Sequence, residues 1–117
     1  MTVRIQRKRT KGWKMPEGAV NCTRPGRWGN PYSVREYGLA RALASFRNRA
    51  IGVMAIAPEY FAPLRGKDLA CWCHLCPRHQ SGKRWNESCA DCDPCHVDIL
   101  LEIANSHVVT TEWRTYE

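Results

Sequence analysis

Features that define several familiar classes of protein are missing from this 117-residue chain. No apolar run approaches the roughly 18–20 residues that a membrane-spanning helix needs. Residues 1–9 are basic but are not followed by an apolar segment, so they do not resemble a secretory signal. We therefore expect a cytoplasmic protein with no membrane partner.

Common catalytic signatures are missing too. The chain has no P-loop, no G-x-G-x-x-G, no Ser-His-Asp order and no pair of carboxylates at catalytic spacing. Asp98 and Glu102 are the candidate carboxylates, and both fall inside one predicted helix. There is also no internal repeat and no low-complexity linker, so residues 1–117 are expected to form a single domain.

Acidic residues are scarce in the first half of the chain. Residues 1–49 hold twelve Lys and Arg against Glu17 and Glu36, a balance of +10, whereas residues 50–117 hold six against nine acids, or −3. A concentrated positive charge attracts phosphate-bearing partners. Trp13 and Trp28 lie among these cations and offer flat faces for bases, which favours a nucleotide or nucleic acid as partner. The charge by itself fits a solvated surface equally well.

The apolar pattern predicts strands that alternate with helices. Val3 and Ile5 alternate with polar neighbours, as in a half-buried strand, and the Ser33 to Glu36 spacing is that of a capping box. Strands are predicted over 3–6, 19–23 and 69–73, with an edge strand in 107–117. Helices are predicted over 33–50, over 58–61, and from Asp93-Pro94 to Asn105-Ser106. This order argues for an α/β fold with a short, largely parallel sheet.

The cysteines are clustered rather than scattered. Six of the seven fall within residues 71–95, and without a secretory signal a disulfide framework is disfavoured. The two C-x-x-C pairs let four thiolates converge on one ion. We therefore predict a zinc-binding insertion at residues 73–95, with zinc held by Cys73, Cys76, Cys89 and Cys92.

Other ligand sets are open. Cys71, Cys73, Cys95 and His96 also suit a metal at the end of the third strand, because Cys71 and Cys73 point to the same side of it. Cys73 cannot serve both sets without bridging two ions. His74 and His79 are substitutes for one of the thiolates.

Cations lie between the two C-x-x-C pairs, at Arg78, His79, Lys83 and Arg84, next to Trp85. A loop of this kind suits a phosphate backbone and a stacked base. The alternative is a solvated hairpin tip with Trp85 folded over the zinc.

Three blocks of sequence together resemble a known family. They are R-P-G-R-W-G-N-P-Y at 24–32, L-R-G-K-D-L-A-C-W-C at 64–73 and C-H-V-D-I-L at 95–100. In this order they are similar to a domain-of-unknown-function family of bacteria and actinobacterial phages, with the patterns W-G-N-P-F and R-G-K-x-L-x-C-W-C…C-H-x-D-V-L. The resemblance implies a small, three-layer Rossmann-like domain, encoded by a bacterium or a phage. It implies no reaction.

The chain departs from the family pattern in two places. Most members join C-W-C to C-H by a short loop, whereas residues 74–94 intervene here. This suggests a zinc-ribbon-like insertion added to an older site made of Cys71, Cys73, Cys95 and His96. Tyr32 also stands where the family usually has Phe.

A ligand pocket is expected where the 24–32 loop meets the start of the third helix. Arg24 and Arg27 suit a phosphate, Trp28 suits a base as stacking partner, and Asn30 suits the edge of that base. The helix start at Cys95 and His96 supplies free N–H groups for an anion and lowers the pKa of a thiol.

These patterns lead to one functional hypothesis and two alternatives. The hypothesis is a zinc-containing protein that binds a phosphorylated nucleotide or nucleic acid. The first alternative is a nucleotide-processing enzyme that cleaves or transfers at an N-glycosidic bond. The second is a phage accessory protein that binds a host protein.

Overall fold

The structure is a computed structural model and describes residues 2–24, 26–84 and 87–105. The edge strand predicted in 107–117 and the placement of Trp85 lie outside these residues. The elements are β1 (Val3–Gln6), β2 (Val20–Asn21), α1 (Val34–Tyr37), α2 (Leu39–Ile56), η1 (Pro58–Leu64), β3 (Leu69–Cys71), η2 (Pro77–His79), β4 (Lys83–Arg84) and α3 (His96–Asn105).

The four strands form one mixed sheet in the order β2-β3-β1-β4. β3 lies at its centre and pairs in parallel with both β1 and β2, while β4 pairs with β1 in the antiparallel direction. A parallel pair needs a long crossover, and the connection from β2 to β3 carries α1, α2 and η1. The predicted α/β class is confirmed, with a short sheet in which two of the three pairings are parallel.

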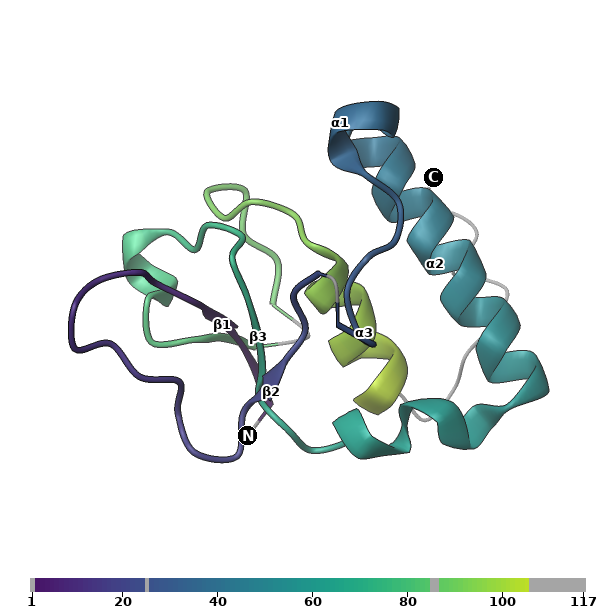
Figure 1. Cartoon of the computed structure of the whole chain (residues 1–117), viewed down its shortest axis with the longest axis horizontal. Helices are drawn as coiled ribbons and strands as arrows, with labels where there is room; N and C mark the ends of the chain where they lie inside the picture. The colour runs from purple at the N-terminus through teal and green to yellow at the C-terminus, as the bar shows by residue number, and fades with distance from the viewer. Residues whose placement is uncertain (1, 25, 85–86, 106–117) are drawn as a thin grey trace.

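The helices lie in two layers beside the sheet, with α3 next to the strands and α2 beyond α3 (Figure 1). α3 packs against β1 and β3, and α2 packs on the other side of α3 (Figure 1). η1 contacts both helices at their lower end in this view. A Rossmann-like arrangement, with helices on both faces of the sheet, is not confirmed. Within the described residues no helix has the length and apolar character needed to cross a bilayer.

The helix predicted over 33–50 differs from the structure at both ends. It is divided at Gly38, whose φ of 81° lies in the left-handed region and cannot continue a helix. Ser33 makes no capping hydrogen bond with its side chain, so the predicted capping box is absent. α2 then runs through Gly52 to Ile56 and buries Leu43, Phe46 and Ala50, as the spacing predicted. Leu39, expected in this stripe, is 40% exposed.

α3 begins at His96, two residues later than predicted. Cys95 takes the N-cap position instead of Asp93: its sulfur accepts the N–H of Val97, and its own N–H donates to Asp98 Oδ2 at 3.2 Å. This is the reciprocal pattern of a capping box with Cys in place of Ser. The cap fixes the Cys95 sulfur at the helix start, facing β3.

Arg4 is one of the polar residues that alternate with Val3 and Ile5 in β1, yet it has no exposed surface. Its Nη1 donates to Asp98 Oδ2 at 2.8 Å, and its Nη2 donates to the backbone oxygen of His74 at 2.9 Å. Gln6, on the same strand, accepts the N–H of Leu75 at 2.8 Å. β1 therefore holds both α3 and the segment that follows β3.

Two glycines provide a matched test of this fold. A Cβ at Gly29 would lie 2.9 Å from backbone atoms of Arg24, whereas a Cβ at Gly52 in α2 meets no atom within 4 Å. We expect Gly29→Ala to lower the free energy of unfolding by about 1 kcal/mol or more, because backbone must move. Gly52→Ala should raise it by roughly 0.5–1 kcal/mol, since alanine favours the helix. Urea unfolding measures both, and equal effects of the two substitutions would contradict the tight turn at Gly29.

Candidate metal centres and ligand cavity

Four potential metal ligands converge in the insertion. Cys76, His79, Cys89 and Cys92, the four-ligand cluster, each place one ligand atom within 4.8 Å of the others. The Cys76 and Cys89 sulfurs are 3.8 Å apart, and His79 Nδ1 lies 3.1 Å from the Cys76 sulfur and 3.4 Å from the Cys92 sulfur. A tetrahedral zinc ion has bonds of about 2.3 Å to sulfur and about 2.0–2.1 Å to nitrogen. It therefore requires roughly 3.8 Å between two sulfurs and roughly 3.6 Å between a sulfur and a nitrogen. The cluster fits one zinc ion.

The surroundings of the cluster also suit a metal. His79 Nε2 lies 2.6 Å from Glu87 Oε2, which leaves Nδ1 to face the sulfurs. A metal-binding histidine usually donates its second N–H to a carboxylate in this way. The backbone N–H of Cys76 donates to the Cys92 sulfur, and Arg78 donates to the Cys89 sulfur. Both contacts favour thiolates over thiols.

The ionisation of the cluster follows from these contacts. Burial opposes the ionisation of Cys76, but hydrogen bonds from His79 and Cys92 outweigh it and lower its pKa to about 6. The hydrogen bond to Glu87 raises the pKa of His79. Burial raises the pKa of Cys92. Zinc binding must therefore displace protons, and lower pH weakens it.

The structure brings together a set of candidate ligands that differs from the predicted set at one position. Cys76, Cys89 and Cys92 are brought together as expected, but Cys73 is not among them, and His79 takes its place. Cys76-x-x-His79 has the same spacing as Cys73-x-x-Cys76, so the signal was present in the sequence. The spacing could not decide between them. Two residues of β1 bind the backbone after Cys73: Arg4 donates to the oxygen of His74, and Gln6 accepts the N–H of Leu75. These hydrogen bonds keep Cys73 with the sheet and away from the insertion.

Cys73 instead joins Cys71 and Cys95 in a second group, the three-cysteine cluster, whose sulfurs lie within 4.8 Å of one another. The Cys95 sulfur is 3.3 Å from that of Cys71 and 3.6 Å from His96 Nδ1. Hydrogen bonds from Cys71 and Cys95 lower the pKa of Cys73 far below its usual range. The contact with Cys73 raises the pKa of Cys71, and the contacts with Cys71 and then Cys73 raise that of Cys95. His96 is held neutral because burial lowers its pKa.

This cluster borders a cavity of about 400 Å³, which we call the Trp72 cavity. Its lining combines cations, aromatic rings and apolar side chains, and among the described residues it has no carboxylate: Thr23, Arg24, Asn30, Tyr32, Ser33, Val34, Arg35, Leu39, Leu43, Cys71, Trp72, Cys73, Pro94, Cys95 and His96. Arg24 and Arg35 are exposed, and Trp72 is 40% exposed at its edge. The cavity is therefore suited to an anion with an apolar or aromatic part.

Four of the six predicted ligand-binding residues line this cavity, namely Arg24, Asn30, Cys95 and His96. The polar atoms of Asn30 are engaged within the protein. Its Nδ2 donates to the backbone oxygen of Ala42 at 3.3 Å, and its Oδ1 accepts the N–H of Tyr32 at 2.8 Å. Asn30 shapes the loop in this way, and the expectation that it reads a base edge has no support from its contacts.

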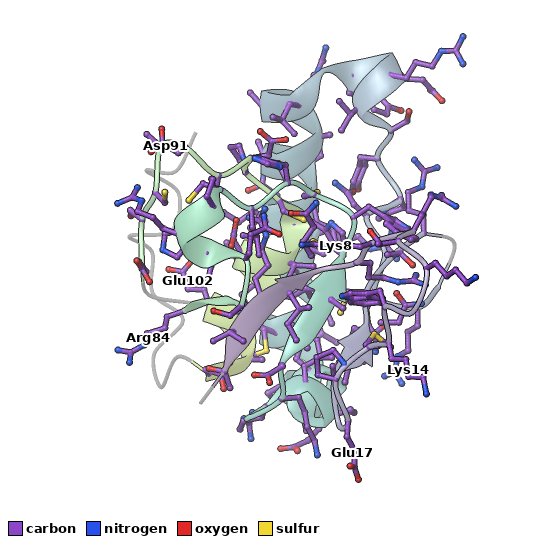
Figure 2. The ribbon with its side chains drawn as sticks, turned by 90° about the vertical axis from the view of Figure 1, so that its left-hand side faces the viewer. Lys8, Lys14, Glu17, Arg84, Asp91 and Glu102 are labelled. Carbon is purple, nitrogen blue, oxygen red and sulfur yellow. The ribbon has the colours of Figure 1, made fainter. Side chains whose placement is uncertain are left out.

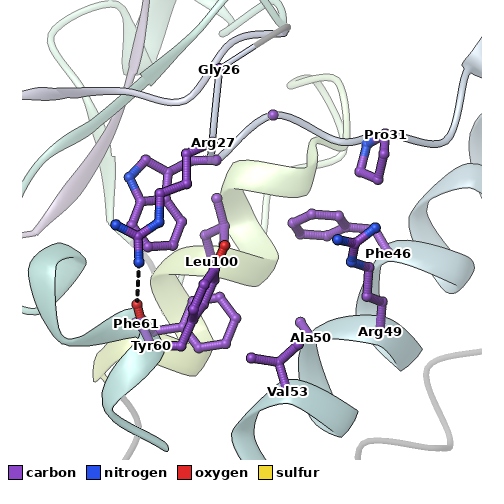
Figure 3. Close-up of a pocket in the computed structure, with 12 residues that line it drawn as sticks. Gly26, Arg27, Pro31, Phe46, Arg49, Ala50, Val53, Tyr60, Phe61 and Leu100 are labelled. Carbon is purple, nitrogen blue, oxygen red and sulfur yellow. Dashed lines mark hydrogen bonds between the residues drawn. The ribbon is translucent and has the colours of Figure 1, made fainter. Parts of the chain in front are cut away.

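The other two predicted residues, Arg27 and Trp28, line a separate cavity of about 360 Å³, the Trp28 cavity (Figure 3). The Trp28 ring is 9% exposed and packs against Tyr60 and Phe61. The Arg27 guanidinium lies over it, 4.4 Å from the ring centre. The loop and the helix start thus share the Trp72 cavity, but Arg27 and Trp28 are not part of it, because the core uses the Trp28 ring.

Basic residues of the N-terminal segment lie against the exposed indole at the edge of the Trp72 cavity. The guanidinium carbons of Arg7 and Arg9 are 4.4 and 4.6 Å from the centre of the Trp72 ring. In Figure 2, Lys14 lies on the right with Glu17 below it, whereas Asp91 and Glu102 lie on the left together with Arg84. Charges of both signs therefore occur on both sides, and the local excess of cations is at the Trp72 ring.

The candidate carboxylates lie elsewhere. Asp98 and Glu102 border a third cavity, of about 690 Å³, together with Arg4, Arg47 and Lys83. Asp98 is paired with Arg4 at 2.8 Å and with Lys83 at 3.5 Å, and Glu102 is paired with Arg47 at 3.3 Å. Both are engaged in ion pairs and neither lines the Trp72 cavity, although Asp98 accepts the N–H of Cys95, which does.

The fold and these sites define a small mixed α/β domain with two cysteine clusters and an anion-suited cavity. The chain belongs to the family described as Domain of unknown function (DUF4326), whose model matches residues 5–106. This confirms the membership that the sequence blocks implied. No curated protein and no solved structure matches the chain.

The four-ligand cluster predicts the effect of removing one histidine but not another. His79→Ala removes a ligand, so we expect zinc affinity to fall by more than the roughly 10–100-fold that loss of an outer-shell partner costs. His74→Ala, the control, removes an exposed imidazole that lies outside the cluster. Competition with a chromophoric zinc chelator measures both. Equal zinc affinity of the two variants would rule out His79 as a ligand.

The contact between His79 and Glu87 has its own test. Glu87→Gln keeps the shape of the side chain but removes the charge that orients the imidazole, so zinc affinity should fall roughly 10–100-fold. Glu59→Gln, at an exposed position in η1, is the control and should leave the affinity unchanged. An affinity of the Glu87 variant within twofold of the control would show that the carboxylate does not support the metal site.

Proposed function

We propose that this protein is a zinc-containing protein that binds the phosphate of a nucleotide, free or within a nucleic acid, in the Trp72 cavity. The observation that carries the proposal is the lining of that cavity. It joins Arg24, Arg35 and the start of α3, with no carboxylate among its described residues. A phosphate in it would gain charge-assisted hydrogen bonds from the arginines.

The lining also suits the rest of a nucleotide. Trp72 is exposed at the edge of the cavity, and Val34 and Leu39 contribute exposed apolar surface beside it. Stacking on an indole accepts any base, because every base has a π-face, and a base on Trp72 would displace one of the two guanidinium groups that lie over its ring. A volume of about 400 Å³ falls within the usual range for small-ligand sites.

The N-terminal cations suit a longer ligand. Arg7 and Arg9 lie against Trp72, and Lys8 lies between them in the chain. A strand that enters the cavity with one nucleotide would meet these cations with its neighbouring phosphates. Binding to nucleic acid would then depend on salt, because each neutralised phosphate releases counterions.

Zinc has a structural role in the proposal. The small core of the insertion consists of Leu75 with Cys76 and Cys92, and Cys89 packs against it. So few apolar side chains cannot stabilise a loop of this length, and a metal ion supplies the missing stability. The four-ligand cluster would fold the insertion against β1, next to the segment that leads from Trp72.

Binding of phosphate-bearing probes tests the proposal. Adenosine monophosphate should bind the wild-type protein more tightly than adenosine, as measured by calorimetry, because the arginines act on the phosphate. An Arg24→Ala/Arg35→Ala variant should lose about tenfold or more of the affinity for the monophosphate. Arg49→Ala in the Trp28 cavity is the matched control and should bind normally.

A short single-stranded oligonucleotide distinguishes nucleic acid from free nucleotide. If nucleic acid is the ligand, its log Kd should change with log salt by about 0.7 per phosphate contact, and Arg7→Ala/Arg9→Ala should flatten that slope. A protein that binds the monophosphate but shows no such slope binds free nucleotide. Failure to bind either probe, or a loss with Arg49→Ala alone, would contradict the proposal and leave a protein partner as the alternative.

A further inference from the structure

We propose that Cys71, Cys73, Cys95 and His96 form a second metal site, for zinc or a metal ion of similar ligand preference, at the floor of the Trp72 cavity. This site is separate from the four-ligand cluster and does not depend on nucleotide binding. Three sulfurs and an imidazole nitrogen are the donor set that zinc prefers in a tetrahedral site.

The three sulfurs are close enough to share one ion. The three sulfurs lie within 4.8 Å of one another, and those of Cys71 and Cys95 are 3.3 Å apart. His96 Nδ1 is 3.6 Å from the Cys95 sulfur. Tetrahedral zinc requires roughly 3.8 Å between sulfurs and 3.6 Å between sulfur and nitrogen. The distance between the Cys71 and Cys95 sulfurs is about half an ångström shorter than the ideal value, and the distance from the Cys95 sulfur to His96 Nδ1 matches it.

His96 is oriented as a ligand. Its Nε2 donates to the backbone oxygen of Cys22 at 2.7 Å, which leaves Nδ1 with a lone pair on the side of Cys95. A backbone carbonyl is a common outer-shell partner of a metal-binding histidine. Nδ1 lies more than 4.8 Å from at least one of the Cys71 and Cys73 sulfurs, so the ring must move by about 1 Å or more to complete a tetrahedral site.

The charges around the cluster balance such a site. A zinc ion with three thiolates and a neutral imidazole carries one net negative charge, which is costly to bury without a cation. Arg4 supplies the cation: it has no exposed surface and interacts electrostatically with all three cysteines. Val97, in the first turn of α3, adds a backbone N–H that donates to the Cys95 sulfur.

Three neighbouring thiols are better explained by a metal than by a disulfide. A disulfide would join two sulfurs and leave the third buried beside them. The third would then lie next to a buried arginine with no role. A metal ion uses all three sulfurs and the oriented imidazole together.

Metal counting tests the site. After loading with zinc and removal of excess, the wild-type protein should hold two zinc ions per chain, and Cys73→Ala should hold one. Cys22→Ala is the matched control: Cys22 is buried close to Cys71 but is outside both clusters, so this variant should keep two. One zinc ion in the wild-type protein, with no change in Cys73→Ala, would overturn the proposal.

Alkylation of the wild-type protein gives a second measurement that needs no variant. The metal-loaded and chelator-treated proteins are treated with iodoacetamide, and the modified cysteines are identified by mass spectrometry. Zinc should protect Cys71, Cys73 and Cys95 at least about tenfold, in addition to the four-ligand cluster. Equal modification of these three with and without zinc, or a disulfide between Cys71 and Cys95 under reducing conditions, would contradict the site.

Discussion

The buried guanidinium of Arg4 is the constraint on which the rest of the arrangement depends. It has no exposed surface, and it joins β1 to Asp98 of α3 and to the backbone of His74. Removing one partner of a buried ion pair typically costs about 3–5 kcal/mol, because the other charge is left without compensation. The same cation lies beside the three-cysteine cluster. One side chain therefore fixes the helix, the start of the insertion and the charge around three thiols.

The division of the cysteines follows from that constraint. The segment after β3 is held at His74 by Arg4 and at Leu75 by Gln6. Cys73 lies before these tethers and remains with the sheet, while Cys76 lies after them and belongs to the insertion. Two clusters result, one inside the domain core and one in a loop with few apolar side chains of its own. Each is compact enough for a single ion.

The ligand cavity combines groups from distant parts of the chain. Arg24 comes from the loop after β2, Arg35 from α1, and Trp72 from the end of β3. The N-terminal arginines reach the same indole from the end of β1. Cations thus gather near the carboxyl ends of the parallel strands, where the described cavity lining has no carboxylate. This local excess of positive charge is the physical basis for preferring an anionic ligand.

The sequence alone determined the local features, because these depend on neighbouring residues. Strand and helix periodicity, the family blocks at 24–32, 64–73 and 95–100, and a metal-type cysteine block could all be read from spacing. Only the tertiary structure decided which cysteines share a site, since Cys73-x-x-Cys76 and Cys76-x-x-His79 are equivalent in spacing. It also decided that Arg4 is buried and that Trp28 belongs to the core. Such choices rest on contacts between residues up to 94 positions apart, as between Arg4 and Asp98, which no local pattern encodes.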